Sequence, residues 1–345
     1  MYTYSTLPID IIQMTISVWA DISHNHQATW INETLVFQSV EGDLHQTAGL
    51  FALPHLSVLQ IMGEDAEKFL QGQLSCDVKQ ISQTVSSLGC CCTPKGRIIA
   101  IFRIIKIAEQ AYALIIEKEI ETHLIQHLSK YIPFFKAKII PSTSDNQPIS
   151  WCCLGLSKQA PEGFDTTSTA VNQAIVREDT ICIRLPSERF LIVTPSKNLN
   201  NLWEQNQNNR LLASTTDWRY LDIEDKIPTV LLEAKEQFVP HDVGLNQVGG
   251  ISFSKGCYTG QEIIARMEYR GTLKQHAVAI THAPLLPFMP AETINIETEG
   301  HSHSIGRMIY SSTNSAGQNI ALVCLKDSFK QNHQFLPNAK ITSII

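Results

Sequence analysis

Short apolar runs, each closed by turn-forming residues, are the pattern that most limits how this chain can fold. The longest runs, such as residues 98–107, are interrupted by Arg103 and Lys106 and fall well short of the ~18 apolar residues that a membrane helix needs. The N-terminal stretch also lacks the positively charged start of a signal peptide. The pattern therefore predicts a soluble, cytoplasmic protein made of short strands and short helices.

The composition provides enough apolar residues for more than one hydrophobic core. The chain has 345 residues, of which 43% are hydrophobic and 17% are charged. At about 150 residues per domain, this length corresponds to two or three domains. The net charge of −6, without a long run of Lys or Arg, argues against a large nucleic-acid-binding surface.

Cysteine and histidine spacing does not indicate a metal site. The nine cysteines include no C-x-x-C pair, so neither a disulfide framework nor a zinc or iron–sulfur motif is predicted. Free thiols fit a reducing cytosol. The closest histidine pairs, His24 with His26 and His301 with His303, both lie in polar sequence typical of turns.

The first half of the chain predicts an antiparallel sheet covered by two helices. A strand at residues 57–62 is followed by a turn at Gly63 and a helix at about residues 64–74, whose apolar positions recur at helical spacing. The residues that follow predict, in order, strands at 85–93, 97–107 and 112–116, a helix at 120–131 ended by Pro133, and a strand at 136–140.

The second half predicts two further units. Polar residues 141–148 indicate a connection or domain boundary. Two hairpin strands at 181–185 and 190–193, with an amphipathic helix from residue 199, indicate a second α+β unit. From residue 272 onward, short strands at 276–280, 293–296 and 320–325 without a helical pattern predict a small β-barrel or sandwich.

Residues 249–271 carry the most informative local pattern. Thr259 and Glu262 have the spacing of a capping box, with Thr259 as the N-cap, which predicts a helix just after Cys257. Lys255 and the helix N-terminus would both favour the thiolate of Cys257, by roughly one pKa unit together. Chemistry alone leaves two interpretations open: a partly ionised functional thiol, or a small buried residue in a tight loop.

Residues 255–262, K-G-C-Y-T-G-Q-E, resemble the signature of the YgfZ family, folate-binding proteins related to the aminomethyltransferase (T-protein) of the glycine cleavage system. The resemblance extends over about residues 56–271, whereas the first 45 residues match no pattern that we can name. Its other blocks occur in the family's order at residues 63–74, 93–97, 238–240 and 249–253.

The resemblance implies an α+β fold, a three-domain aminomethyltransferase-like ring around a central folate channel. Residues 1–45 would be an N-terminal extension without assignment, and residues 271–345 a C-terminal β-barrel. Residues 46–270 would form the folate-binding region from two α+β subdomains, one at about 63–140 and the other mainly at 150–250.

The implied function is tetrahydrofolate binding that supports iron–sulfur cluster assembly or repair, and thereby iron–sulfur enzymes such as those that thiomethylate tRNA. The implied partners are the folate and iron–sulfur assembly proteins or their clients, with neither nucleic acid nor a membrane. Cys257 corresponds to the hallmark cysteine of the family. Together with Lys255, it is the candidate for a chemical role.

A folate site needs an aromatic plate for the flat pterin ring and a carboxylate that accepts hydrogen bonds from its edge. Trp218 and Glu224 correspond to residues with these roles in related proteins; without the resemblance they would be interpreted as a core tryptophan and a surface carboxylate. Leu56 replaces a tryptophan found in some relatives, and Tyr258 is a further candidate for the site.

Basic residues could receive the anionic glutamate tail of folate, or could simply be solvated surface charges. Arg266 and Arg270 are four residues apart on the expected helix after the signature, and therefore on one face. Lys95 and Arg97 lie on the expected hairpin turn.

Two other functions remain open at this stage. A folate-dependent one-carbon transferase with an unknown acceptor is favoured by Glu224, and a non-catalytic adaptor would hold folate as a structural ligand. Related aminomethyltransferases carry an Asp pair on a strand that corresponds here to residues 96–102, which contain no carboxylate. Glycine cleavage activity is therefore not expected, and the sequence does not decide whether the protein is an enzyme.

Overall fold

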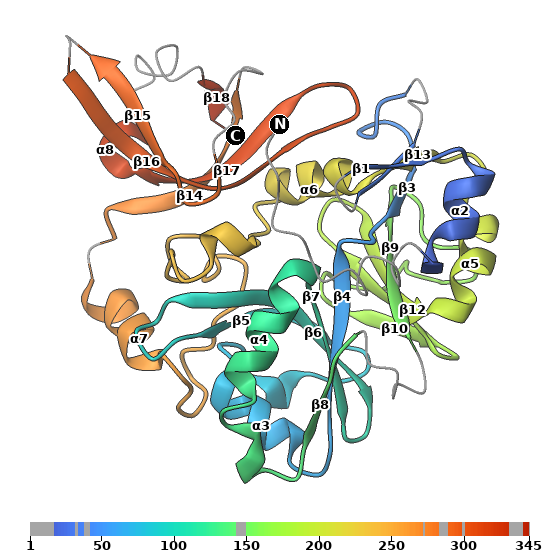
Figure 1. Cartoon of the computed structure of the whole chain (residues 1–345), viewed down its shortest axis with the longest axis horizontal. Helices are drawn as coiled ribbons and strands as arrows, with labels where there is room; N and C mark the ends of the chain where they lie inside the picture. The colour runs from blue at the N-terminus through green and yellow to red at the C-terminus, as the bar shows by residue number, and fades with distance from the viewer. Residues whose placement is uncertain are drawn as a thin grey trace.

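The structure is a computed structural model, and it describes residues 17–31, 34–37, 42–142, 150–271, 273–282, 289–298, 301–330 and 341–344. These residues form three larger β-sheets and a two-stranded hairpin, with helices that cover or connect the sheets (Figure 1). Among the described residues, no helix is both long enough and apolar enough to cross a membrane.

The first sheet is antiparallel and contains the strands predicted for residues 57–140. Helices α3 (Ala66–Gln73) and α4 (Glu121–Leu128) pack on one of its faces, so the prediction of a sheet with two helices is confirmed. The strand order is β5 (Ser87–Cys92), β6 (Ile98–Ala108), β7 (Ala111–Glu117), β4 (Leu56–Met62), β8 (Lys138–Ile140).

The second sheet is antiparallel except for its last pair, which is parallel. Helix α5 (Leu199–Asn206) covers its outer face, as the sequence predicts for a helix from residue 199. The strand order is β10 (Ala174–Arg177), β11 (Thr180–Leu185), β12 (Arg189–Pro195), β9 (Trp151–Ser157), β3 (Gly49–Ala52), β13 (Leu211–Ala213).

Both of these sheets are buried on two faces, because the first sheet also packs against the second. In β7, Leu114 and Ile116 face the helices α3 and α4, whereas Ala113 and Ile115 face the second sheet. Successive side chains of a strand point to opposite faces, so a strand buried on both sides must be apolar throughout. This arrangement explains the uninterrupted apolar runs of the sequence.

Part of the N-terminal segment belongs to the core of the second sheet. Helix α2 (Ala20–Asn25) lies beside α5, and Trp19 packs edge-on against Trp203 with ring centroids 6.0 Å apart. The hairpin strands β1 (Thr29–Ile31) and β2 (Thr34–Val36) follow. His24 therefore lies in a helix, and not in a turn as the sequence suggested.

The third sheet has the strand order β15 (Thr293–Thr298), β16 (His301–Thr313), β17 (Asn319–Lys326), β14 (Gln275–His282), β18 (Ile341–Ile344). In the chain, the short helix α8 (Asp327–Lys330) comes directly after β17. Strands β15 and β18 each pair with one neighbour only among the described residues, so this sheet is open. Within the described residues no hydrogen bonds join these two edges, so the predicted C-terminal β-barrel is not confirmed.

Strand β16 was not predicted. Its first residues, His301 to Ser304, are polar and mostly exposed, so they lack the apolar alternation from which a strand is inferred. Pairing with β15 holds them extended, whereas β17 pairs with β16 from Gly306 onward. The rings of His301 and His303 consequently lie on a strand, 6.4 Å apart, and not in a turn.

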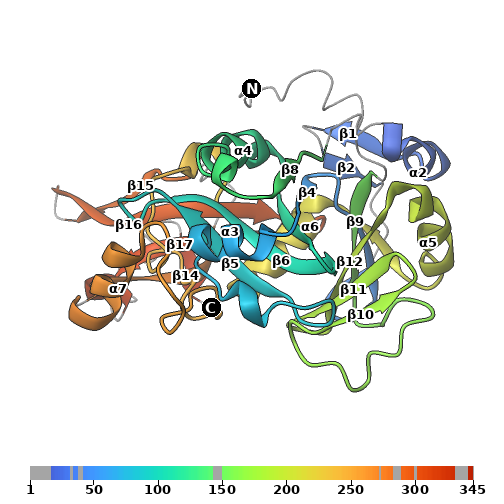
Figure 2. The same ribbon diagram turned by 90° about the horizontal axis from the view of Figure 1, so that it is seen from below.

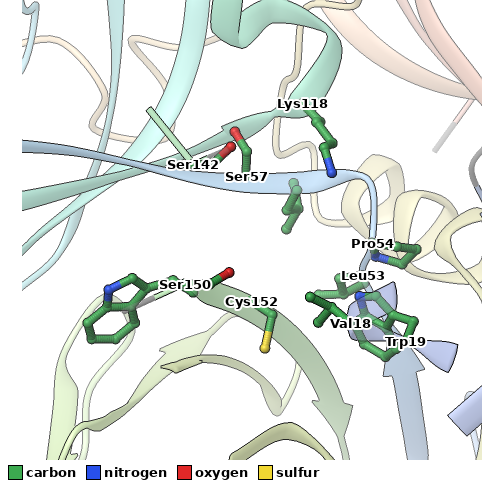
Figure 3. Close-up of a pocket in the computed structure, with 11 residues that line it drawn as sticks. Val18, Trp19, Leu53, Pro54, Ser57, Lys118, Ser142, Ser150 and Cys152 are labelled. Carbon is green, nitrogen blue, oxygen red and sulfur yellow. The ribbon is translucent and has the colours of Figure 1, made fainter. Parts of the chain in front are cut away.

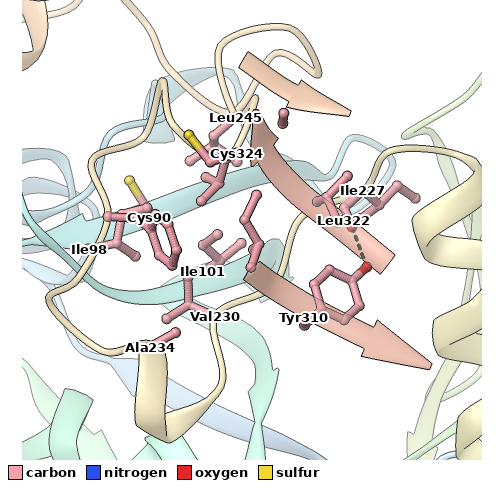
Figure 4. Packing of buried hydrophobic residues seen from close by; sticks show 14 of the residues in the cluster. Cys90, Ile98, Ile101, Ile227, Val230, Ala234, Leu245, Tyr310, Leu322 and Cys324 are labelled. Atoms are coloured by element: carbon pink, nitrogen blue, oxygen red, sulfur yellow. Dashed lines mark hydrogen bonds between the residues drawn. The ribbon is translucent and has the colours of Figure 1, made fainter. Parts of the chain in front are cut away.

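Helix α6 (Thr215–Glu224) contacts strands of both the second and the third sheet. The third sheet also packs against the first sheet through a shared apolar cluster, in which the Tyr310 hydroxyl donates to the Ile227 carbonyl at 2.7 Å (Figure 4). Helix α7 (Gln261–Arg270) lies at the opposite end of the molecule from α5 (Figure 2).

Short 3₁₀ helices complete the described structure. They are η1 (Val78–Gln80), η2 (Lys118–Ile120), η3 (Ile132–Phe134), η4 (Ser196–Asn198) and η5 (Leu232–Ala234). The predicted polar boundary at residues 141–148 falls mostly outside the described residues, which exclude 143–149.

Candidate functional site

An open cavity lies where the first sheet, the second sheet and α6 meet. The space inside it, counted together with the solvent at its open mouth, is about 580 Å³. Most of its wall is apolar, with contributions from Leu88, Ile101, Ile115, Leu185 and Leu191. The polar groups are His55, Arg103, Glu117, Asp222 and Thr229. We call this space the sheet cavity.

Helix α6 supplies an aromatic ring and a carboxylate to the sheet cavity. Trp218 and Asp222 are four residues apart and therefore lie on one face of the helix. The Trp218 indole is 3% exposed, packs edge-on against Phe51 at 5.2 Å, and lies 4.8 Å from the Arg189 guanidinium. These neighbours fix the ring in the cavity wall.

A capping box sets where α6 begins. The Ser214 backbone N–H donates to the Asp217 carboxylate at 3.0 Å, and the Ser214 side chain accepts from the backbone at Asp217. A fixed start also fixes which face of the helix is turned toward the cavity. The cap therefore contributes to the placement of Trp218 and Asp222.

The two carboxylates of the cavity are each paired with an arginine, Asp222 with the buried Arg189 and Glu117 with the partly buried Arg219. Arg189 donates to Asp222 at 2.7 Å, and Arg219 donates to Glu117 at 2.6 Å. Burial raises the pKa of Asp222, while the charge of Arg189 acts in the opposite direction. A carboxylate has about four acceptor positions, so each can accept further hydrogen bonds from a ligand.

Arg103 and His55 complete the polar lining. Arg103 donates to Asn172 Oδ1 at 2.7 Å, and although burial lowers its pKa to about 10, it stays charged at neutral pH. The His55 Nδ1 lies 3.0 Å from the Thr215 hydroxyl, and burial, with the charge of Arg219, holds its pKa well below 6.5. The cavity thus offers one cation, a neutral imidazole and two paired carboxylates.

Glu224 does not line this cavity. It is six residues after Trp218, so at 100° per residue it points from a different side of α6. Its Oε1 lies 3.6 Å from His45 Nε2, and burial raises its pKa against the effect of His45. Leu56, by contrast, does line the cavity. The structure therefore brings Trp218 together with Leu56 and Asp222, and not with Glu224.

The sequence contains a signal for two of these polar residues, Arg103 and Asp222. Arg103 interrupts an apolar strand whose neighbours are all buried, which is unusual unless the charge faces a polar site. Asp222 has helical spacing from Trp218. Glu117 and His55 had no comparable signal, because each is paired with a residue about 100 or more positions away.

The segment that carries Cys257 lies apart from the cavity lining. Cys257 is exposed, whereas the other eight cysteines are buried. Helix α7 begins at Gln261, and its N-cap is Gly260 at φ +87°, so the predicted cap at Thr259 is wrong. The Thr259 hydroxyl instead contacts Gln73 Oε1 at 3.2 Å, which ties this segment to α3.

Lys255 points inward. Its amino group donates to the carbonyls of Leu74 and Cys76 at 2.7 and 2.8 Å and lies 5.1 Å from the centre of the Tyr258 ring. Burial lowers the pKa of Lys255 to about 8. These contacts anchor the segment to the residues after α3, so the predicted role of Lys255 in promoting the Cys257 thiolate has no support in this geometry.

The remaining predicted residues also lie away from the sheet cavity. Tyr258 is buried, burial raises the pKa of its hydroxyl, and that hydroxyl has no hydrogen-bond partner among the described residues. Arg266 is exposed on α7, and Lys95 and Arg97 are exposed on the neighbouring turn. None of the four lines the cavity.

We expect Cys257→Ala to leave the free energy of unfolding unchanged within about 0.5 kcal/mol, because the side chain is exposed. Cys153→Ala, at a fully buried position of β9, should cost about 1 kcal/mol or more. Urea denaturation of the two variants provides the comparison. A large loss for Cys257→Ala alone would mean that this thiol has a structural role.

Comparison with known proteins agrees with this architecture. Residues 17–157 match the family model described as the GCVT N-terminal domain. The tRNA-modifying protein YgfZ of Hamiltonella defensa subsp. Acyrthosiphon pisum (strain 5AT) is 31% identical over 259 residues, which cover 73% of this chain and 72% of the relative. The chain belongs to the YgfZ family. The resemblance inferred from residues 255–262 is thus confirmed.

A solved structure shows the same fold at low identity. The glycine cleavage system aminomethyltransferase T of Bartonella henselae superposes with a TM-score of 0.70 and 16% identity, over 91% of this chain and 90% of that one. The YgfZ-family chain therefore has an aminomethyltransferase-like fold. The GCVT match begins at residue 17, so it includes α2, β1 and β2, for which the sequence suggested no relationship.

Proposed function

We propose that this protein binds tetrahydrofolate or a derivative in the sheet cavity, and that it supports iron–sulfur cluster assembly or repair and, through it, tRNA modification. The observation that supports folate binding is the lining of the sheet cavity. Trp218 provides an aromatic wall beside Asp222 and Glu117, two carboxylates that can accept from the donor-rich edge of a pterin. The name of the Hamiltonella relative supports the link to tRNA.

The residues present fit a reduced folate. A pterin is flat, largely apolar on its faces and polar at its edge, and the cavity combines apolar walls with acceptors and one donor cation, Arg103. When bound, the folate would supply one-carbon or redox chemistry. The residues of this chain would orient it: Trp218 and Leu56 against its faces, Asp222 and Glu117 at its edge.

For the cellular role, we propose that exposed Cys257 is the group that other components of cluster assembly contact. The expected cellular result is loss of function for Cys257→Ala despite normal folding. Full rescue of an iron–sulfur enzyme defect by this variant would remove the case for a chemical role of the thiol. The reducing cytosol is the compartment in which nine free cysteines persist most easily.

A one-carbon transferase is a weaker candidate. Glu224, which favoured it, contacts His45 and does not line the sheet cavity. Strand β6 brings no carboxylate to the cavity. Transfer of a labelled methyl or formyl group from folate to an acceptor would reverse this ranking.

We also propose that the three sheets correspond to three domains arranged as a ring around the folate, with the third sheet, after residue 271, as an open-sheet domain. The sheets do not follow the expected subdomain boundaries strictly, because β3 precedes the first sheet in sequence but belongs to the second sheet.

Titration with tetrahydrofolate tests the proposal. Trp218→Phe keeps an aromatic ring but shortens it, so binding should weaken about fivefold, equivalent to roughly 1 kcal/mol. Trp203→Phe is a matched control, because Trp203 is equally buried but packs under α2. Absence of measurable binding by the wild type, or equal effects of the two substitutions, would contradict the assignment of the cavity.

A further inference from the structure

Strand β6 brings a buried cation to the wall of the sheet cavity. Arg103 is 6% exposed and lines the cavity together with Ile101 of the same strand. Its partners on the neighbouring strands are Leu88 of β5 and Ile115 of β7, and both also line the cavity. The guanidinium of Arg103 is therefore surrounded by apolar side chains within this sheet.

Arg103 differs from the other two arginines near the cavity, because it has no carboxylate of its own. Arg189 is paired with Asp222, and Arg219 is paired with Glu117. Among the residues that the structure describes, no carboxylate forms an ion pair with Arg103, although the charge of Asp222 acts on it from a greater distance. A buried charge costs free energy unless it is paired or hydrogen-bonded.

The hydrogen bonds that Arg103 makes with described residues leave one edge of its guanidinium for a ligand. Both bonds are donated by Nη1, to Ser86 Oγ at 3.2 Å and to Asn172 Oδ1 at 2.7 Å. A guanidinium also carries N–H donors on Nε and Nη2. These two nitrogens form an edge with two parallel N–H groups, which fits two acceptor oxygens that lie side by side.

The donors of Arg103 belong to the sheet cavity and not to the hollow beside it. That second hollow adjoins the sheet cavity at Leu56, and Trp19 contributes to one of its sides (Figure 3). Leu56 lines both spaces, whereas Arg103 lines only the sheet cavity. A ligand that contacts Arg103 must therefore lie in the same space as the Trp218 ring.

Folates differ from one another at a part of the pterin that has acceptor oxygens. The 4-oxo group lies next to N5, and N5 carries a hydrogen, a methyl group or a formyl group in the different forms. A 5-formyl group, in one of its two planar orientations, places a second carbonyl oxygen beside the 4-oxo oxygen. A 5-methyl group instead places an apolar surface there.

We propose that Arg103 makes the sheet cavity selective for a folate with a carbonyl group on N5, such as 5-formyltetrahydrofolate, by donating from Nε and Nη2 to the formyl and 4-oxo oxygens. This inference rests on the proposed binding of the pterin beside Trp218. The donor-rich edge of the pterin would contact Asp222 and Glu117, so donors would face acceptors at both edges. A 5-methyl folate would leave buried donors of Arg103 without a partner, which lowers affinity.

The chemistry of arginine fits a binding role at this position. Strand β6 contributes Arg103 and no carboxylate to the cavity. A guanidinium has no acceptor and stays protonated, so it cannot take a proton from a substrate. Arg103 would therefore hold and select the folate rather than act as a general base.

The experiment measures the affinities of tetrahydrofolate, 5-methyltetrahydrofolate and 5-formyltetrahydrofolate by calorimetric titration. The wild type should bind the 5-formyl compound about tenfold more tightly than the 5-methyl compound, the size of one charged hydrogen bond. Arg103→Met should weaken the 5-formyl compound about tenfold and change the 5-methyl compound by no more than about twofold. Arg184→Met is the matched control and should leave the preference unchanged, because Arg184 is partly buried, donates to the Thr166 carbonyl at 3.1 Å and does not line the cavity.

Arg103→Lys separates the charge from the shape of the guanidinium. Lysine keeps a positive charge but has no planar fork with parallel donors. The preference for the 5-formyl compound should therefore fall to about threefold, between the values for the wild type and Arg103→Met. Melting temperatures without ligand show whether each variant is folded; if Arg103→Met is not, the wild-type ranking and Arg103→Lys decide the question.

The outcomes distinguish this inference from the proposed function. If the wild type binds none of the three folates, the proposed function fails, and the role of Arg103 fails with it. If the wild type binds the three equally well or prefers the 5-methyl compound, or if Arg103→Met weakens all three by the same factor, the folate proposal stands and the selectivity assigned to Arg103 is overturned.

Discussion

Arg189→Met is expected to lower the free energy of unfolding by about 3–5 kcal/mol. Arg189 is 1% exposed and donates through Nε to Asp225 at 3.0 Å and through NH1 to Asp222 at 2.7 Å. Loss of the guanidinium would leave the carboxylates of Asp222, on α6, and of Asp225, at its C-cap, without their buried countercharge. It would also remove the cation that lies 4.8 Å from the Trp218 ring.

The triple variant Arg189→Met/Asp222→Asn/Asp225→Asn is the control for this effect. Replacement of a complete buried ion pair by neutral groups is often close to neutral, so the triple variant should recover most of the stability that the single variant loses. Urea denaturation measures both. A single variant as stable as the wild type would mean that water reaches these carboxylates and solvates them.

The first sheet could be predicted well because its determinants are local. The strand before Gly63 and the helix after it follow from apolar spacing over fewer than twenty residues, and Gly63 has φ +135°, a backbone conformation that favours glycine. A Cβ at Gly63 would lie 2.3 Å from the Lys136 carbonyl oxygen, so the turn also depends on close contact with the residues just before β8. Such contacts with distant residues are what the sequence does not display.

Only part of the candidate site could be predicted from the sequence, again because contacts between distant residues position its side chains. The family resemblance points to Trp218 and to Glu224 as its carboxylate partner, whereas the period of the helix favours Asp222, four residues after Trp218. Lys255 was expected beside the Cys257 thiol because the two are close in sequence. Its real partners are the carbonyls of Leu74 and Cys76, about 180 residues earlier in the chain.

Gly155→Val is expected to lower the free energy of unfolding by about 3 kcal/mol, the upper end of the usual range for overpacking. A Cβ at Gly155 would lie 2.4 Å from one ring carbon of Trp218 and 3.1 Å from Phe51 Cβ. The indole cannot move away freely, because the Arg189 guanidinium lies on it. The displaced ring would intrude on the sheet cavity, so tetrahydrofolate binding should weaken more than tenfold.

Whether Gly155→Val lowers or raises the free energy of unfolding distinguishes the effect of packing from that of backbone preference. Gly155 lies within β9, where valine is intrinsically favoured over glycine, so backbone preference alone predicts that Gly155→Val stabilises the protein. Gly72, in α3, has no atom within 4 Å of its added Cβ, and Gly72→Ala should stabilise the protein by about 0.5–1 kcal/mol. Thermal melts and folate titrations of Gly155→Val and Gly72→Ala would show which of the two effects determines stability at Gly155. If Gly155→Val melts at or above the wild-type temperature and binds tetrahydrofolate normally, the Trp218 indole is not fixed where the structure places it.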